Sequence, residues 1–406
     1  MNFRATARRV LTVPHRMYFL MAVTQLVVVS AWWAWALAAR YFPDVFGTPH
    51  SVLPATYLHT LFMIYGFLPF FMFGFLFTAG PRWLSMPPPP ARRYVPGGVM
   101  ASLGVLGLLP ANSFSPVSVA LALCIFLAGW LWNLVVFANL IFASRAPERV
   151  HATLIAVALG FGASGLAAAI ASVLLEWPAA MEWARIAGIW FFLLPVFITV
   201  SHRMIPFFTA SVVSMVHPWR PWWLLSAMLG GAVGHGVLEI LGQTQWTWLV
   251  DAPIAFLLFD LSRRWGLAQS MANRLLAMLH IGFFWQAMAF ALYALHSILQ
   301  ATGHAGIGQA PLHALAIGFC SSLMLAMVTR VTCGHSGRTL AADTLTWRLF
   351  MLLQFAAVMR IFADVLLGQR GIFLGMALGL WCACMITWSI KYAPVYWRPR
   401  ADGTPG

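Results

Sequence analysis

The stretch EWARIAGIWFFLLPVFITVSHRMIPFFTA, residues 182–210, carries an apolar run that is too long and too uniform for a β-strand. Because about 20 consecutive apolar residues span the hydrocarbon core of a bilayer as a helix, this run predicts a membrane-spanning helix over 183–208. The run ends on His202 and Arg203, shortly before Pro206. Proline frees carbonyl groups one turn earlier in a helix, so the polar pair either serves the freed backbone or forms part of a site.

The composition extends this interpretation to the whole chain. Of the 406 residues, 61% are hydrophobic and 8% are charged, whereas a soluble domain has about 25% charged residues. Apolar runs of helical length recur from end to end, and a transmembrane barrel would show much shorter alternating segments. The sequence therefore predicts an all-α, polytopic integral membrane protein.

Twelve apolar runs, separated by polar or Pro/Gly-rich breaks, predict about 12 transmembrane helices. The first run lacks a cleavage site of small residues, so we expect it to be retained as a helix. The predicted organisation is a basic cytoplasmic N-terminus over 1–16, a twelve-helix bundle over 17–393 and a cytoplasmic tail over 394–406. The expected spans are 17–39, 54–79, 95–110, 115–142, 150–175, 183–208, 221–241, 246–262, 271–301, 308–332, 345–367 and 371–393.

The distribution of Lys and Arg predicts the orientation of this bundle. On one side of the membrane, the loops and span ends hold 20 of the 24 basic residues. Cytoplasmic loops are enriched in Lys and Arg, so we expect both the N-terminus and the C-terminus to lie inside. The same rule accounts for the net charge of +14 without nucleic acid as a partner.

Two histidines lie at matching depths on the second and tenth predicted spans. His59 and His313 are each about one turn from the outer end of their span. An ionisable residue inside a membrane costs about 2.5–3.5 kcal/mol and is a functional candidate by default. The two imidazoles could ligate one haem iron from both sides, and Gly66 and Gly318 would let a flat group approach the helices. The alternative is that each imidazole hydrogen-bonds a nearby carbonyl group.

A second group of polar residues lies toward the cytoplasmic side. His202, His280 and His335 form a tier of imidazoles that could hold a metal. Arg203 and Arg330 lie at the same level, and guanidinium groups pair well with carboxylates such as haem propionates. Arg330 also has a simpler interpretation, as a basic anchor at the inner end of its span.

Two i, i+4 pairs lie within predicted spans, His235 with Glu239 and Arg360 with Asp364. Helical spacing places the members of each pair on one face. A hydrogen-bonded pair is the simplest interpretation of the first, and a self-neutralising ion pair of the second. Arg360 also lies at the level of the two outer histidines, where a propionate would need a partner. Glu239 and Asp364 are the main carboxylates expected inside the spans.

Three stretches together resemble the NnrS family of polytopic membrane proteins. They are HTLFMIYGFLPFFMFGFLFTAGPRWL (59–84), HRMIPFFTA (202–210) and HALAIGFCSSLMLAMVTRVTCGHSGR (313–338). The last is the most specific, because it carries a His…Met-x-x-Arg…Gly-His-x-Gly-Arg series in one helix and its exit loop. The motif positions of the family fall on His59, His202, Arg203, His313, Arg330, His335 and Arg338.

The resemblance implies a haem- and copper-containing protein of the bacterial inner membrane that acts in nitric oxide metabolism and nitrosative-stress protection. The haem would be of the b type, because the chain has no C-x-x-C-H sequence for covalent attachment. Nitric oxide, the lipid bilayer and an electron donor, either a quinol or a cytochrome, are the expected partners. The resemblance leaves open whether the protein is an oxidoreductase.

Depth within the spans and the resemblance together assign roles to the candidate site residues. We expect His59 and His313 to be the axial ligands of a haem on the outer side. A second metal site on the inner side would use His202 and His280, with His335. Candidates for holding propionates or substrate oxygens are Arg203, Arg330 and Arg360.

The sequence departs from the family pattern in the second span. Many members have a His-x-His-Glu-Met series, whereas this chain has His59-Thr60-Leu61-Phe62-Met63. Metal ligation by the second histidine and the glutamate of that series is therefore not expected here. Many members also have glycine at the position of His202, so the inner imidazoles would be a feature of a subgroup.

Two other functional classes fit parts of the pattern. A secondary transporter often has twelve helices with both termini inside, but few carboxylates are expected in the spans to couple protons. A haem–copper quinol or oxygen reductase would suit the number of spans and histidines. The sequence, however, shows no adjacent His-His pair on one helix.

Overall fold

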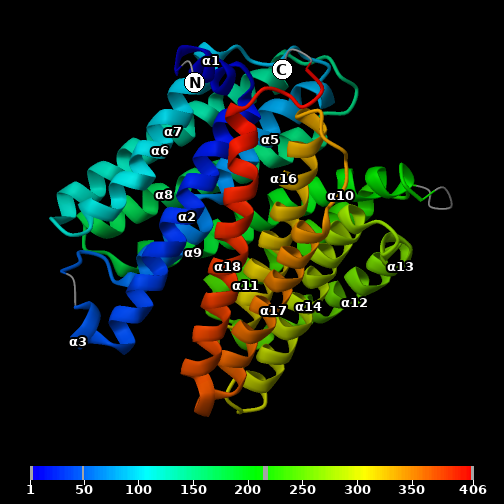
Figure 1. Cartoon of the computed structure of the whole chain (residues 1–406). Coiled ribbons are helices and arrows are strands. Elements are labelled where there is room, and N and C mark those ends of the chain that lie inside the picture. The colour runs from blue at the N-terminus through cyan, green and yellow to red at the C-terminus, as the bar shows by residue number, and fades with distance from the viewer. Residues whose placement is uncertain (1–2, 48–49, 214–217, 404–406) are drawn as a thin grey trace. The chain divides into compact units, whose positions relative to one another are not determined.

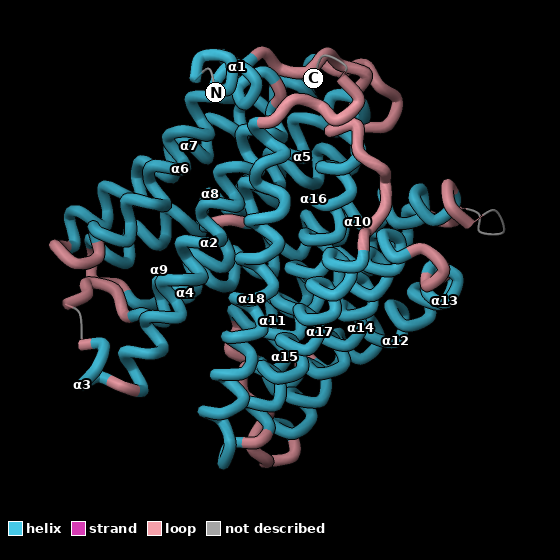
Figure 2. Tube along the Cα trace, in the orientation of Figure 1, coloured by secondary structure: helices cyan, strands magenta, loops and turns pink. Residues whose placement is uncertain are grey.

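Helices make up nearly the whole of the computed structural model (Figures 1 and 2). The structure describes residues 3–47, 50–213 and 218–403, and no strand occurs in these ranges. The prediction of an all-α fold is therefore confirmed. Contacts divide the chain into two compact units: unit 1 is Met1–Val196 with Ser389–Gly406, and unit 2 is Phe197–Trp388.

Unit 1 contains the first half of the chain and the end of the last helix. Its elements are α1 (Phe3–Thr12), α2 (Pro14–Tyr41), α3 (Pro43–Phe46), α4 (Ala55–Leu61), η1 (Phe62–Gly66), α5 (Leu68–Trp83), α6 (Ala91–Ala111), α7 (Pro116–Ala143), α8 (Val150–Leu174), α9 (Pro178–Ile186) and η2 (Ala187–Leu193). The start of α10 (Leu194–Ala210) and the end of α18 (Arg370–Trp397) complete it.

Unit 2 contains the rest of α10 and α18 and everything between them. Its other elements are α11 (Trp222–Ile240), η3 (Thr244–Trp246), α12 (Trp248–Arg264), α13 (Leu267–Ser270), α14 (Arg274–Ala301), α15 (Ala310–His313), η4 (Ala314–Ser321), α16 (Ser322–His335), α17 (Thr344–Val365) and η5 (Leu367–Gln369).

Each of the twelve predicted spans coincides with one helix or with consecutive helical segments. Within the described ranges, ten of these are long and apolar enough to cross a membrane. The other two are α12, which has 17 residues, and α17, which includes Arg348, Arg360 and Asp364. The fold is that of a multi-pass membrane protein, with ten candidate spans by length and composition.

Helix α1 and the last turns of α18 belong to unit 1 and lie at the same end of it (Figure 1). Arg16, at the start of α2, donates from Nη1 to the carbonyl oxygen of Arg398 at 3.3 Å, just beyond α18. Tyr94, in the first turn of α6, donates its hydroxyl to the carbonyl oxygen of Leu11 at 2.6 Å. Chain ends on the same side of a membrane require an even number of crossings between them.

Glycines let α6 and α7 pack backbone against backbone in unit 1. A Cβ atom at Gly129 would lie 2.3 Å from the backbone nitrogen of Ala101, and one at Gly104 would lie 2.5 Å from that of Phe126. Small residues permit such close approach, and in lipid the packing gained this way is a main source of helix association. The crossing of α6 and α7 therefore depends on the absence of these side chains.

Replacing Gly129 by Leu should destabilise the protein by at least about 1–3 kcal/mol, because the added side chain forces two backbones apart. Thermal unfolding of the purified protein in detergent, followed by tryptophan fluorescence, measures the change. Gly107→Leu on α6 is the matched control, since a Cβ there meets nothing within 4 Å. Equal melting temperatures for the two variants would contradict the proposed packing.

Candidate functional site

His59 lies on α4 in unit 1, one helical turn after the segment begins. Its ring stacks on the indole of Trp33 from α2, with centroids 3.8 Å apart and the planes inclined by 20°. The side chain is only half-buried. The stacking fixes the plane of the imidazole, which is a requirement for directing a ring nitrogen at a metal.

His313 lies in unit 2 and is the last residue of α15. Its Nδ1 atom is 2.9 Å from the carbonyl oxygen of Gln309. Because a carbonyl oxygen only accepts, Nδ1 carries the proton and Nε2 carries the lone pair. Metal-bound histidines commonly donate their other ring N–H to a backbone carbonyl group in this way. We expected a hydrogen bond to a carbonyl group as the alternative to metal ligation. Because this hydrogen bond orients the ring, it also favours ligation.

Each outer histidine lies beside a π-helical segment. His59 comes shortly before η1, and His313 comes directly before η4. A third segment, η2, precedes the part of α10 that carries His202. Segments of π-helix occur frequently at functional sites, because the wider turn redirects side chains. These three segments fall in the second, sixth and tenth predicted spans.

The space beside Gly318 is already filled. A Cβ atom there would lie 2.5 Å from the indole of Trp285, whose Nε1 donates to Gln354 Oε1 at 2.7 Å. The flat group that approaches this glycine is therefore a tryptophan of α14. A haem bound at His313 would have to approach over another face of the helix.

The inner histidines His202 and His280 are both fully buried in unit 2. His202 Nε2 is 3.3 Å from the carbonyl oxygen of Pro221. His280 Nε2 is 2.8 Å from the hydroxyl oxygen of Thr209, which itself donates to the carbonyl oxygen of Ile205 at 2.8 Å. Since the threonine proton is used, His280 donates from Nε2 and keeps the lone pair on Nδ1.

The Nδ1 atom of His280 is buried and has no hydrogen-bond partner among the described residues. A buried acceptor left in this state costs about 1–3 kcal/mol, so such atoms usually have a function or a bound ligand. A lone pair on an imidazole nitrogen suits a copper ion or an ordered water. This atom is the observation in unit 2 that best fits a bound metal.

A complete metal centre is not preformed in the described ranges. They contain no group of three or more His, Cys, Asp and Glu side chains that could hold a metal ion. His335 is the last residue of α16 and is partly exposed. His202, His280 and His335 therefore do not come together in this structure as ligands of one copper ion. Sites in which only one of these histidines binds the metal are compatible with the structure.

The arginines differ in their surroundings. The guanidinium of Arg330 lies over the ring of Phe208 at 3.9 Å, so it packs against the stretch that contains His202. Arg203 is half-buried beside His202 on α10, and this helix continues through Pro206 to Ala210. His202 and Arg203 therefore lie within a continuous helix and not at a break in it.

Arg360 forms the expected ion pair with Asp364. Its Nη1 atom is 2.7 Å from one carboxylate oxygen, and Arg370 approaches the other at 3.4 Å. The i, i+4 interpretation is confirmed. With its carboxylate partner already in place, Arg360 has less positive charge to offer a propionate.

The sequence reasoning missed a buried carboxylate, Asp251. It is fully buried on α12, and its oxygens lie 2.8 and 3.0 Å from Nδ1 of His235 on α11. The hydroxyl of Thr247 also bonds the carboxylate, and the ring of Tyr293 on α14 packs at 4.6 Å from that of His235. Glu239, the partner that we expected, is only half-buried at the end of α11. The sequence feature that could have singled out Asp251 is its position in the first turn of its helix, where a carboxylate is favoured.

The fold and these buried polar groups define a multi-pass helical membrane protein with several oriented imidazoles. The sequence family described as NnrS protein matches residues 9–400. Because the match covers nearly the whole chain, the protein belongs to the NnrS family. Among proteins with curated descriptions, none matches this sequence significantly.

Removing Asp251 should be strongly destabilising. Asp251→Ala leaves His235 buried without its carboxylate, and breaking a buried pair from one side costs about 3–5 kcal/mol. The double variant His235→Phe/Asp251→Leu should be more stable than Asp251→Ala. Chemical denaturation in detergent micelles compares these variants with Glu182→Ala, which removes the acid of a more exposed Glu182–Arg185 pair and should cost about 0–1 kcal/mol. Equal costs for the buried and exposed carboxylates would contradict the assignment.

Proposed function

We propose that this protein binds haem and copper in the bacterial inner membrane and acts in nitric oxide metabolism or nitrosative-stress protection. Membership of the NnrS family and the multi-pass helical fold support the proposal. The observation that carries it is the bond from His313 Nδ1 to the carbonyl oxygen of Gln309. This bond selects the tautomer with the lone pair on Nε2, the form in which histidine ligates iron.

In this proposal His313 and His59 are the two axial ligands of a b-type haem. His59 belongs to unit 1 and His313 to unit 2. Such a haem would supply an iron that binds nitric oxide and changes its oxidation state. Trp33 would keep the plane of His59 fixed, and Gln309 that of His313. Arg203 and Arg330 lie at the inner level, away from this haem, and are proposed to hold substrate oxygens.

Copper would be held on the inner side, where His280 presents a buried Nδ1 lone pair. The second proposed ligand is His202, whose Nε2 is committed to the carbonyl oxygen of Pro221 and whose lone pair is therefore on Nδ1. His335 is partly exposed at the end of α16, and the described residues do not bring it together with these two histidines. Imidazole nitrogens suit copper in either oxidation state.

The proposed topology has twelve transmembrane helices with both termini in the cytoplasm. A helix coincides with every predicted span, and α1 and the last turns of α18 lie at one end of unit 1. The 20 Lys and Arg residues predicted on the inner side support the orientation. On this topology α12 and α17 also cross the membrane, with their charged residues near the ends or in ion pairs.

The nature of the reaction follows from what the buried groups allow. Nitric oxide is small and uncharged, so it can reach a site in the bilayer through lipid. The described helices bury large apolar side chains, including Trp130, Trp190 and Trp388, around their interior. An oxidoreductase of this kind would take electrons from a quinol or a cytochrome, which we propose as partners together with the lipid bilayer.

A second candidate function is proton-coupled transport. The buried Asp251–His235 pair favours it, because carboxylates and histidines inside transporters often carry protons. The two candidates differ in a simple property. A haem protein absorbs strongly in the visible range, whereas a transporter of this class is colourless and moves a solute into proteoliposomes.

His59→Ala and His313→Ala should each abolish haem absorbance in the purified protein, because each removes one of two axial ligands. His304→Ala is the matched control. His304 is exposed, and its Nδ1 atom is hydrogen-bonded to the hydroxyl of Thr302, two residues earlier in the chain. Visible spectra of the three variants, normalised to protein, test the pairing, and size-exclusion profiles show whether each variant is folded. Full haem occupancy in either single variant would refute it.

His280→Ala should remove bound copper without changing the haem content. The reason is that Nδ1 of His280 is the buried donor that the proposed inner site requires. Metal analysis by mass spectrometry compares this variant with His296→Ala on the same helix, where Nδ1 already accepts the N–H of Ile307 at 3.0 Å. Stoichiometric copper in His280→Ala would exclude this residue as a ligand.

A further inference from the structure

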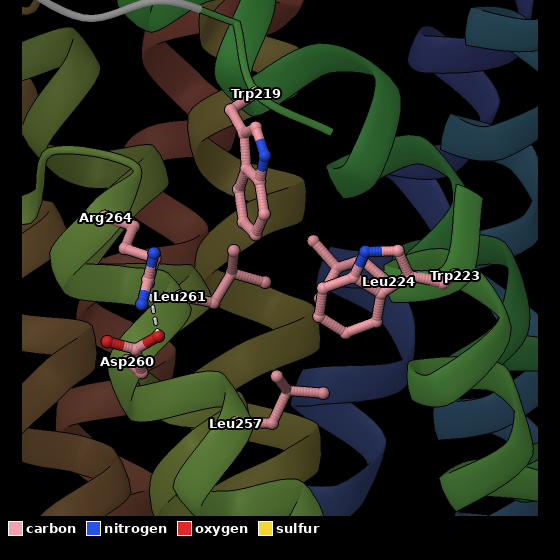
Figure 3. A pocket seen from close by; sticks show the side chains of 7 residues that line it. All are labelled: Trp219, Trp223, Leu224, Leu257, Asp260, Leu261 and Arg264. Carbon is pink, nitrogen blue, oxygen red and sulfur yellow. Dashed lines mark hydrogen bonds and ion pairs between the residues drawn. The ribbon is translucent and has the colours of Figure 1, made fainter. Parts of the chain in front are cut away.

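A hollow of about 160 Å³ lies between the start of α11 and the last turns of α12 in unit 2 (Figure 3). The indoles of Trp219 and Trp223 form one part of its wall, with centroids 6.1 Å apart and the planes inclined by 70°. Leu257 and Leu261 of α12 line it between the indoles and the polar side. The hollow thus has an apolar interior bounded by two aromatic rings.

The opposite side of the hollow is charged. Asp260 accepts one bond from Arg263 on Oδ1 and another from Arg264 on Oδ2. Arg264 also lies 5.7 Å from the ring centre of Trp219. The two arginines have no other acid partner among the described residues, so one carboxylate faces two guanidinium groups. Arg263 lies outside the lining of the hollow but bonds the same carboxylate, so the end of α12 beside the hollow carries an excess of one positive charge.

The aromatic wall is open to the surroundings of the protein. Trp219 is 43% exposed and Trp223 is 56% exposed. Indoles are enriched where a membrane protein meets the boundary between hydrocarbon and water. The Nε1 atom of the buried Trp265 donates to the carbonyl oxygen of Trp219 at 3.0 Å and so holds this wall in place. Indoles together with charged side chains are typical of the boundary between lipid and water.

We propose that this hollow binds an anionic phospholipid. The phosphate contacts Arg263 and Arg264, and the first part of an acyl chain lies against Trp219, Trp223 and the leucines. Basic pockets between transmembrane helices recognise anionic head groups, and the excess positive charge at the rim matches one phosphate. The inference is independent of the proposed function, because it involves none of the proposed haem or copper ligands.

The charged rim also distinguishes this occupant from a quinol. A quinol ring is neutral, and its hydroxyl groups would need acceptors. Both oxygens of Asp260 already accept from arginines, so the carboxylate is not available to bind a hydroxyl group. What the rim offers is surplus guanidinium donors, which favour an anion.

Native mass spectrometry of the full-length protein tests the proposal. The protein is equilibrated with equal amounts of phosphatidylglycerol and phosphatidylcholine of identical acyl chains, and retained lipids are counted after detergent release. The wild type should retain phosphatidylglycerol preferentially. Arg263→Gln/Arg264→Gln should lower that retention by about fivefold per arginine, since each basic residue near a membrane surface contributes about that factor. Arg185→Gln, which breaks an exposed ion pair of unit 1, should leave it unchanged.

Asp260→Asn gives a prediction of opposite sign. It removes the only carboxylate of the rim while keeping the shape, so phosphatidylglycerol retention should rise. If Asp260 served only to hold the arginines in place, retention would fall, and the proposal would be wrong. Equal retention of both lipids by the wild type, or displacement of the phosphatidylglycerol by a short-chain quinol, would also overturn it. Melting temperatures of the variants identify any that are misfolded.

Discussion

The interior of a bilayer contains no water, and this constraint governs the placement of the buried imidazoles of the protein. A polar side chain inside the described helices must find its partner within the protein. The imidazoles do so by bonding to a backbone carbonyl group, a hydroxyl group or a carboxylate: His313 with Gln309, His202 with Pro221, His280 with Thr209 and His235 with Asp251. Each partner fixes the orientation of a ring and, through the shared proton, the nitrogen that carries the lone pair.

This placement has a chemical consequence. An imidazole held by one nitrogen is pre-oriented at the other, so the constraint that satisfies a buried histidine also prepares it as a ligand. His280 shows the effect most clearly, because its Nδ1 atom is buried and lacks a hydrogen-bond partner in the described ranges. The same constraint explains why Arg360 and Asp364 neutralise each other one turn apart. Buried charge is tolerated where its partner is close.

The helices could be predicted from the sequence because the bilayer imposes a long apolar run on each of them. The Arg360–Asp364 pair was predictable for a similar reason, since i, i+4 spacing is a local property. The π-helical segments η1, η2 and η4 were not, because a shift in hydrogen-bond register leaves no mark on composition. The predicted span 183–208 already included Pro206, and α10 does pass through this proline without ending.

The contacts of the candidate site were less predictable than its residues. Asp251 meets His235 from a different helix, and no spacing rule connects positions 16 residues apart across a turn. Gly318 predicted room for a flat group, but which flat group fills it, Trp285, depends on the packing of α14. The depth of a histidine follows from hydropathy, whereas the atom that it bonds follows only from the fold.

Two π-helical segments, η1 and η4, each begin within three residues of one of the two outer histidines. The central claim of the account is that oriented imidazoles in these helices hold a b-type haem. The visible absorption spectrum of the purified wild-type protein, with a pyridine haemochrome assay, tests it most directly. We predict a reduced spectrum with the sharp bands of six-coordinate haem b, and a colourless protein that inserts and folds normally would contradict the account.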